Sequence, residues 1–246
     1  MSKKKINNEK VRQLRLLNDD TPFAIKESFS QLRTNILYSS ADNDSCPVYA
    51  FTSSYEHVGK STVSSNVAVS FAQINKKVLL IDADMRRSTQ YIAFNDHKNH
   101  FGLSELLAGI IKDPSEVICS PMENLSVLLA GCIPPNPSEL LNSKRFEDLL
   151  NTWKNEYDII FIDLPPVDSV SDPLTVAHLT DGYILVAMAG KSNAKRVNSV
   201  IASLEALGAK IIGIILNGSS LKKNGGYYRS YKYSGYYGGY YNSYRK

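Results

Sequence analysis

The sequence has few cysteines and no long apolar run. Its three cysteines, Cys46, Cys119 and Cys132, have no spacing typical of metal ligands, so we interpret them as reduced thiols. No stretch approaches the ~18 consecutive apolar residues that a membrane helix needs. No apolar segment follows the N-terminal lysines, which argues against a secretory signal. These absences predict a cytoplasmic globular chain.

Acidic residues are nearly absent from both ends of the chain. Residues 222–246 carry six lysines and arginines and no acid, and residues 1–15 carry six with one glutamate. The net charge of the whole chain is only +4, so the body between the ends is acidic. Basic ends are compatible with an anionic membrane surface, nucleic acid, the acidic body of a neighbouring subunit, or simply mobile arms.

Short, continuous apolar runs alternate with helical patterns along the body. Such runs suit strands that are buried on both faces of a parallel sheet. The predicted strands are 48–52, 78–81, 125–129, 159–162, 183–186 and 211–216. The predicted helices are 24–38, 60–74, 143–155 and 193–207, the last closed by Gly208. The alternation predicts a doubly wound α/β fold with a mostly parallel sheet, in which ligands bind beyond the carboxyl ends of the strands.

A phosphate-binding sequence follows the first predicted strand. Gly59-Lys60-Ser61-Thr62 opens the helix at residue 60, and Ser54 stands where such loops usually have their first glycine. Amides at a helix start form a cradle for anions. Lys60 is then expected to reach the β- and γ-phosphates of a nucleotide, and the Ser61 hydroxyl to coordinate Mg²⁺. The alternative is an ordinary strand–turn–helix connection.

Carboxylates follow two other strands at the same predicted edge. Asp82 and Asp84 come after the strand at 78–81, and Asp163 comes after the strand at 159–162. Carboxylates gather in this way when a divalent cation offsets their repulsion or when one must accept a proton, as phosphoryl transfer requires. Alternatively, Asp84 caps a helix and Asp163 forms a turn before two prolines.

The C-terminal segment, 222–246, has no aliphatic residue and no periodic apolar face, so we predict that it is disordered. A flexible chain rich in hydroxyls is a suitable kinase substrate, although an aromatic segment that stacks on nucleic-acid bases is the alternative. Nine of the fifteen tyrosines lie in this segment and are the predicted phosphoacceptors: Tyr227, Tyr228, Tyr231, Tyr233, Tyr236, Tyr237, Tyr240, Tyr241 and Tyr244.

These motifs together resemble the bacterial tyrosine kinases (BY-kinases), in particular the small cytoplasmic type that controls capsular or extracellular polysaccharide synthesis. The resemblance rests on the loop at 54–62, the acidic motif LLIDADMR, the motif IIFIDLPP and the terminal tyrosine cluster. It implies a P-loop NTPase fold like that of the MinD/ParA ATPases. It also implies an ATP- and Mg²⁺-dependent autokinase that phosphorylates a neighbour's tail in a ring-like homo-oligomer.

Roles for single residues follow from the resemblance. Asp84 is the expected base toward the tyrosine hydroxyl, and Ser61, Asp82 and Asp163 surround Mg²⁺. The full set comprises catalytic Lys60, Asp82 and Asp84; nucleotide-binding Ser54, Gly59, Lys60, Ser61 and Thr62; and metal-binding Ser61, Asp82 and Asp163. The implied partners are a membrane-embedded chain-length regulator, which activates the kinase and recruits it to the inner face of the membrane, and a protein-tyrosine phosphatase.

The sequence departs from the family pattern in two places. Glu56-His57-Val58 replaces Pro-Gly-Glu in the loop, and a histidine with positive φ costs on the order of 1 kcal/mol. In the family's assembly motif, Glu-x-x-Arg-x-x-Arg, Glu27 and Arg33 match but Ser30 replaces the first arginine. We therefore expect weaker nucleotide binding and weaker assembly.

Three other functions compete with this interpretation. A partitioning or septum-positioning ATPase of the same class would carry a lysine at position 55, where this chain has Tyr55. A catalytically inactive adaptor would keep the fold but not the reaction. A nucleic-acid-binding module is disfavoured and would depend on residues 222–246. The predicted organisation is a basic arm at 1–23, a P-loop kinase domain at 24–221 and a substrate tail at 222–246.

Overall fold

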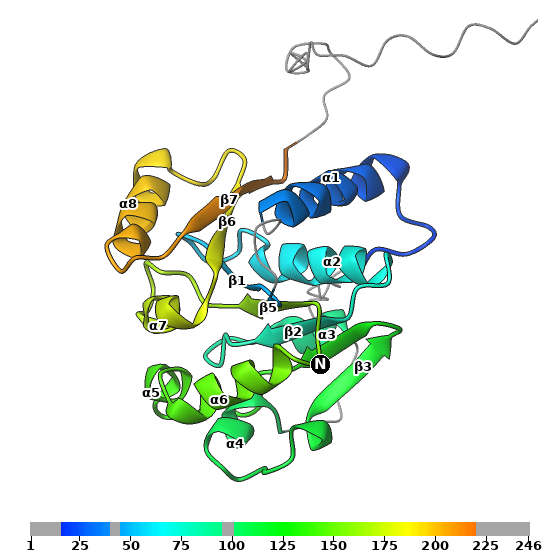
Figure 1. Ribbon diagram of the computed structural model, residues 1–246. Helices are drawn as coiled ribbons and strands as arrows, with labels where there is room; N and C mark the ends of the chain where they lie inside the picture. The colour runs from blue at the N-terminus through cyan, green and yellow to red at the C-terminus, as the bar shows by residue number, and fades with distance from the viewer. Residues whose placement is uncertain (1–15, 40–44, 95–100, 220–246) are drawn as a thin grey trace, which may run out of the picture.

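A seven-stranded sheet forms the centre of the molecule in the computed structural model, which describes residues 16–39, 45–94 and 101–219 (Figure 1). Its strand order is β3-β4-β2-β5-β1-β6-β7. All neighbouring strands run parallel except β3 and β4. The strands are β1 (Val48–Thr52), β2 (Val78–Asp82), β3 (Ile118–Met122), β4 (Leu125–Leu128), β5 (Ile159–Asp163), β6 (Gly182–Met188) and β7 (Ile211–Asn217).

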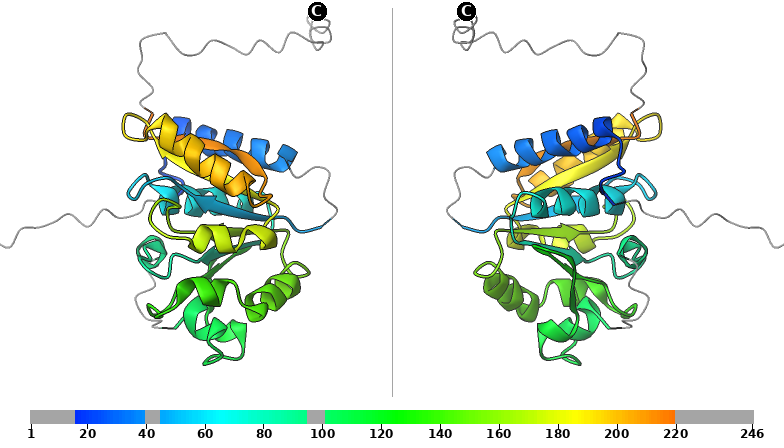
Figure 2. Two further views of the ribbon diagram at one scale, coloured as in Figure 1. Left: turned by 90° about the vertical axis from the view of Figure 1, so that its left-hand side faces the viewer. Right: turned by 90° about the vertical axis from the view of Figure 1, so that its right-hand side faces the viewer.

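Helices cover both faces of this sheet. Their bounds are α1 (Phe23–Ser39), α2 (Lys60–Ala72), α3 (Gln90–Ala93), α4 (Leu103–Leu107), α5 (Pro137–Leu141), α6 (Lys144–Trp153), α7 (Asp172–Thr175) and α8 (Ala194–Glu205). Figure 2 shows α1 and α8 on opposite sides of the β6–β7 end of the sheet. The doubly wound α/β prediction is therefore confirmed.

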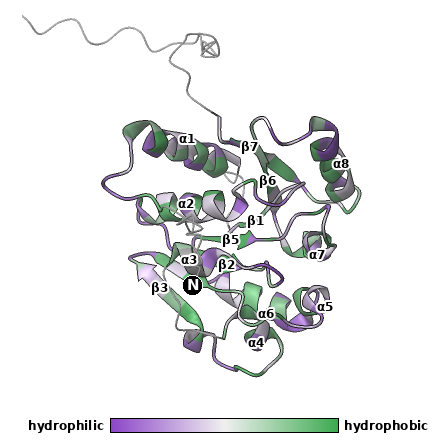
Figure 3. Ribbon diagram, turned by 180° about the vertical axis from the view of Figure 1, so that it is seen from behind, coloured by the Kyte–Doolittle hydropathy of each residue, from purple (hydrophilic) through white to green (hydrophobic). Residues whose placement is uncertain are grey.

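Each face of the sheet has its own hydrophobic core. On one face, Phe146, Leu150 and Trp153 of α6 and Val200 of α8 pack against the strands. On the other face, α2 is buried along nearly its whole length. The ring of Phe71 packs edge-on against that of Phe161 of β5, with 5.3 Å between the ring centroids. β1, β2 and β5 are buried at every position, and their sequences are apolar without alternation up to the polar residue that ends each strand (Figure 3).

The predicted strands and long helices are all present, with ends that differ by two residues or fewer. Strand β3 was not predicted, because it contains Pro121 and has a largely exposed side. It pairs antiparallel at the edge of the sheet, where half-exposed strands with proline are tolerated. Helices α3, α4, α5 and α7 were not predicted either, because with four or five residues each they are too short to show helical periodicity.

The predicted assembly face of α1 is partly used inside the chain. Arg33 donates from Nη1 to the Ser70 carbonyl of α2 at 2.7 Å and from Nη2 to Ser30 Oγ at 3.2 Å. Ser70 lies in the last turn of α2, where helix carbonyls lack partners within the helix. Arg33 therefore caps α2, whereas Glu27 is exposed.

Several predictions fall on parts of the chain that the structure does not describe. They are the first part of the basic arm, residues 1–15, and the tail with all nine phosphoacceptor tyrosines. The predicted domain boundaries stay a prediction. Among the described residues, no helix is both long enough and apolar enough to cross a membrane.

Candidate functional site

The loop between β1 and α2 reverses the chain with two residues of positive φ. Gly59 has φ +84° and lies at the N-cap of α2, and His57 has φ +58°. His57 thus adopts the left-handed conformation that was expected to be costly, and its side chain is 74% exposed. Val58 is only 2% exposed, packs in the core and does not line the cavity described below. The loop therefore accommodates the substituted residues without placing Val58 in the site.

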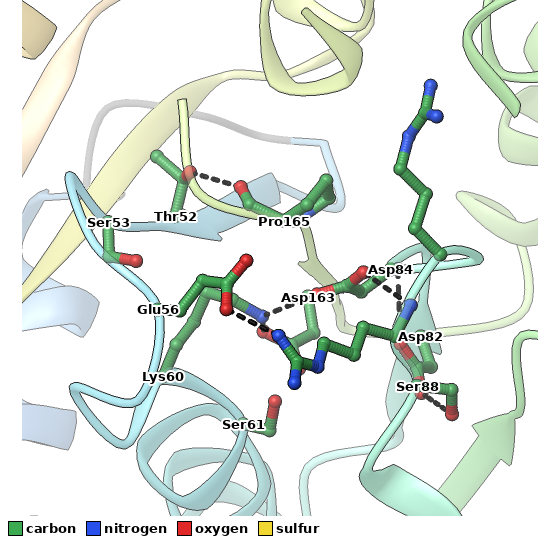
Figure 4. Close-up of polar contacts among 12 residues, drawn as sticks. Thr52, Ser53, Glu56, Lys60, Ser61, Asp82, Asp84, Ser88, Asp163 and Pro165 are labelled. Atoms are coloured by element: carbon green, nitrogen blue, oxygen red, sulfur yellow. Dashed lines mark hydrogen bonds and ion pairs between the residues drawn. The ribbon is translucent and has the colours of Figure 1, made fainter. Parts of the chain in front are cut away.

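The Lys60 ammonium is buried among carboxylates at the carboxyl edge of the sheet. Its Nζ lies 2.6 Å from Asp163 Oδ1 and 3.9 Å from Asp84 Oδ2 (Figure 4). Burial by itself disfavours the charged form, but attraction by Asp163 and Asp84 outweighs it and raises the pKa of Lys60. Lys60 is thus a fixed positive charge beside the helix N-terminus, as a phosphate-binding lysine must be.

Asp82 and Asp163 end neighbouring strands in register with each other. Both are fully buried. Burial, together with the charge of Asp163, raises the pKa of Asp82 to about 7, although Ser88 opposes the shift by donating to Asp82 Oδ2 at 2.6 Å. Asp84 is 9% exposed, and burial raises its pKa as well. The three aspartates therefore form one electrostatic group around Lys60.

A cavity of about 510 Å³ opens over this group. Of the predicted site residues, Gly59, Lys60, Ser61, Thr62 and Asp84 line it, while Asp82 and Asp163 are buried and are not in its lining. The other lining residues are Ser53, Tyr55, Glu56, His57, Arg86, Arg87, Thr89, Pro165, Pro166, Ser169, Val170, Met188 and Asn217.

Ser54, one of the predicted nucleotide-binding residues, is not among the residues that line the cavity. It is 2% exposed, and its Oγ has no hydrogen-bond partner in the described part of the chain. Its neighbour Ser53 lines the cavity instead and donates to the Tyr55 carbonyl at 2.7 Å.

The acidic motif carries two arginines whose partners were not predicted. Arg86 donates to both oxygens of the fully buried Asp172, from Nε at 2.8 Å and from Nη2 at 3.0 Å. Arg87 Nη1 lies 2.5 Å from Glu56 Oε2 across the mouth of the cavity. No local signal in the sequence could have paired them, because Arg86 and Asp172 are 86 residues apart.

Two polar residues complete the site and were also missed. Asn217 at the end of β7 donates from Nδ2 to the Val58 carbonyl at 2.9 Å. Gln90 at the start of α3 is fully buried and donates to Asp163 Oδ2 at 2.8 Å. Asn217 directly follows a predicted strand, which is the one signal that could have identified it. Gln90 lies nine residues beyond the predicted strand at 78–81, where no such signal applies.

The donor set fits a hydrated Mg²⁺ better than a cation held by protein ligands alone. Among the described residues, no cluster of three or more His, Cys, Asp or Glu side chains could hold a metal. Mg²⁺ commonly uses one or two carboxylates together with waters and phosphate oxygens. Asp82 and Asp163, which end neighbouring strands, and Ser61, which lines the cavity, are the residues that would hold such an ion.

Comparison with known proteins identifies the family. An AAA domain model matches residues 49–208. Tyrosine-protein kinase YwqD of Bacillus subtilis is 38% identical over 204 residues, which cover 82% of this chain and 85% of YwqD. The chain belongs to the bacterial tyrosine-protein kinases. Among solved structures, the chimerical protein CapA2B2 is 36% identical to it with a TM-score of 0.75, over 80% of this chain and 86% of that one.

The rival partitioning-type ATPases share only the fold with this kinase. The septum site-determining protein MinD of Pyrococcus horikoshii, solved as a complex with Mg-ADP, has a TM-score of 0.60 over 70% of each chain and 23% identity. The P-loop NTPase fold prediction is thus confirmed, and the kinase family prediction is confirmed by the closer relatives.

Proposed function

We propose that this kinase is an ATP-dependent tyrosine autokinase that regulates capsular or extracellular polysaccharide synthesis. The observation that carries the proposal is the convergence of Lys60 with Asp82, Asp84 and Asp163 beneath one cavity at the N-terminus of α2. Membership of the tyrosine-protein kinase family supports the reaction type.

The phosphates of ATP bind at the start of α2 in this proposal. The amides that follow Gly59 and the Lys60 ammonium attract the negative charge. The Ser61 hydroxyl and the Thr62 side chain line the same part of the cavity. Ser61, Asp82 and Asp163 are the residues that would hold Mg²⁺, which would supply positive charge to offset that of the phosphate oxygens.

Asp84 is the proposed general base. It lines the cavity, lies 3.9 Å from Lys60 Nζ and has a raised pKa, chiefly because it is buried. A carboxylate with a raised pKa accepts a proton from a tyrosine hydroxyl more readily than one with an ordinary pKa. Of the three aspartates, only Asp84 is in the cavity lining, where an acceptor side chain enters.

The position of β7 supports the tail as the substrate. β7 ends at Asn217, whose side chain contacts the phosphate-binding loop through the Val58 carbonyl. The last described residue, 219, is therefore close to the site. A flexible chain of about 25 residues spans roughly 25–30 Å r.m.s., about the diameter of a domain. The tyrosines at 227–244 are thus within reach of their own site and of a neighbour's, and we propose transfer to the neighbour in a ring-like homo-oligomer.

Charge on the tail provides a route to disassembly. Each phosphate adds about −1.5 to −2 charge, so three or four phosphates reverse the sign of the tail. We expect a variant with all nine tail tyrosines changed to phenylalanine to stay assembled in Mg-ATP while the parent dissociates. Equal dissociation of the two, measured by light scattering, would contradict this.

We further propose two partners for the kinase. A membrane-embedded chain-length regulator activates it and recruits it from the cytoplasm to the inner face of the membrane, and a protein-tyrosine phosphatase reverses the reaction. Its family supports the first of these, since the matched chimera CapA2B2 joins parts of more than one protein.

The function is tested by incubating the purified chain with Mg-ATP, with and without the regulator's cytoplasmic segment, and probing for phosphotyrosine. We expect phosphorylation in the parent and none in Lys60→Met. Lys76→Met is the matched control, because Lys76 is a half-exposed lysine 3.7 Å from Asp158, away from the cavity. Nucleotide binding without any phosphotyrosine would instead indicate an inactive adaptor.

A further inference from the structure

Gln90 is a buried amide that touches both halves of the phosphate site. It starts α3, eight residues after Asp82, and none of its surface is exposed. Its Nε2 donates to Asp163 Oδ2 at 2.8 Å and to Ser64 Oγ at 3.1 Å, and lies 3.4 Å from the Ser61 carbonyl. One side chain thus joins β5 to the first turn of α2.

The orientation of this amide is determined by its partners. An ionised carboxylate only accepts hydrogen bonds, so the Gln90 nitrogen must face Asp163. The Gln90 oxygen then faces Ser65, whose Oγ donates to it at 2.5 Å. Every polar atom of Gln90 is used, and none is available for a substrate.

Gln90 and Lys60 each bind a different oxygen of Asp163. With Oδ2 held by the amide, Oδ1 accepts from Lys60 Nζ at 2.6 Å. Without the amide, Oδ2 of the fully buried Asp163 carboxylate would lack its donor, and the carboxylate could rotate. The same loss would release the link to Ser61, because the contact to its carbonyl comes from the same nitrogen.

We propose that Gln90 is a positioning residue that fixes Asp163 relative to Ser61, two of the three residues to which the proposed function assigns Mg²⁺. The inference rests on that function, since it concerns the same site. Groups that orient metal ligands by hydrogen bonding typically change metal affinity 10–100-fold when they are removed. Removing the Gln90 amide should therefore weaken nucleotide binding in the presence of Mg²⁺. The binding that is due to Lys60 and the loop amides should stay largely unchanged.

Isothermal titration of the full chain with ADP, once with Mg²⁺ and once with EDTA, tests this. In Gln90→Met, which keeps the volume of the side chain but not its hydrogen bonds, we expect the dissociation constant with Mg²⁺ to rise about tenfold or more. The constant in EDTA should stay within about twofold of that of the parent. Gln73→Met is the matched control, because Gln73 is an exposed glutamine at the C-cap of α2, and both of its constants should be unchanged.

Gln90→Asn is the second variant, for use if the methionine variant folds poorly. It keeps the amide but shortens the side chain by one methylene, so we expect the same loss of affinity with Mg²⁺ and the same unchanged affinity in EDTA. A purely structural role would weaken binding equally with Mg²⁺ and EDTA, or lower the unfolding temperature alone, and either result overturns the inference. If the parent itself binds no ADP under both conditions, the proposed function fails with it. A parent that binds while both variants keep its Mg²⁺ dependence refutes the Gln90 role alone.

Discussion

Asn217, the last residue of β7, is in direct contact with the backbone at Gly59, 158 positions earlier in the chain. A Cβ on Gly59 would lie 2.2 Å from Asn217 Nδ2, and the same nitrogen donates to the Val58 carbonyl at 2.9 Å. The Asn217 side chain at the end of β7 therefore leaves no room for a Cβ at position 59 of the phosphate-binding loop.

Gly59→Ala should be destabilising for two separable reasons. One is the positive φ of +84°, which costs an alanine about 1 kcal/mol, and the other is the clash with Asn217. Gly190→Ala isolates the first, because Gly190 has φ +74° and a Cβ added there would meet nothing within 4 Å. In chemical denaturation, Gly59→Ala should lose clearly more stability than Gly190→Ala.

Asn217→Ala should rescue part of that loss. By itself it removes one hydrogen bond and costs about 1 kcal/mol. Combined with Gly59→Ala it also removes the clash, so the double variant should be more stable than the sum of the single effects implies. Additive losses in the same denaturation series would show that the clash is not what makes the glycine necessary.

The pKa of Asp82, about 7, predicts an unusual pH dependence of stability. Its ordinary value is 3.8, so between these two values the folded state holds a proton that the unfolded state has lost. The contribution of Asp82 to the free energy of unfolding should therefore fall as the pH rises from about 4 through 7. Asp82→Asn should remove this decline and be more stable than the parent at pH 8, by an amount on the order of 2–4 kcal/mol.

Denaturant titrations at pH 5 and pH 8 without nucleotide or Mg²⁺ check this. Asp148→Asn is the control, because Asp148 is 63% exposed in a surface ion pair and should leave the pH slope unchanged. If the difference in stability between the parent and Asp82→Asn is the same at pH 5 and pH 8, the raised pKa of Asp82 is contradicted.

Lys60→Met should be strongly destabilising as well as inactive. It removes the cation 2.6 Å from the fully buried Asp163 and leaves that charge uncompensated, which typically costs about 3–5 kcal/mol. Lys76→Met, at a half-exposed pair, should cost less than about 1 kcal/mol. Thermal or denaturant unfolding of the two variants compares them directly, and similar small losses would mean that the Lys60 pair contributes little to the fold.

Asp172→Asn should slow phosphoryl transfer without weakening nucleotide binding. Asp172 holds Arg86 through two hydrogen bonds, and Arg86 lies two residues after the proposed base, Asp84. A loosened loop misplaces the base, so we expect kcat to fall about tenfold or more while the dissociation constant for ADP stays the same. Asp168→Asn, which breaks the surface pair with Arg196, is the control. Weaker ADP binding with an unchanged kcat would place the role of Arg86 in nucleotide binding instead.

The three strands at the middle of the sheet share one property that made them easy to predict, which is burial on both faces. β1, β2 and β5 are buried at all five positions each, so their apolar runs are unbroken in the sequence. Polar residues directly after such runs gather at one edge of a parallel sheet. The same reasoning therefore predicted the site residues Lys60, Asp82, Asp84 and Asp163. Ser54 is the exception, since it is 2% exposed and is not among the residues that line the cavity.

Only the tertiary structure could show the partners that give those residues their properties. Gln90, Asn217 and Asp172 each lie tens of residues or more from the group that they contact, and no local pattern encodes such pairings. The sequence by itself determined the order of the strands along the chain and the residue types at their carboxyl ends, because burial periodicity is a local property. The packing of the two faces decided which oxygen of Asp163 meets Lys60 and how far the pKa of Asp82 rises, because hydrogen bonds and desolvation depend on neighbours brought together only by folding.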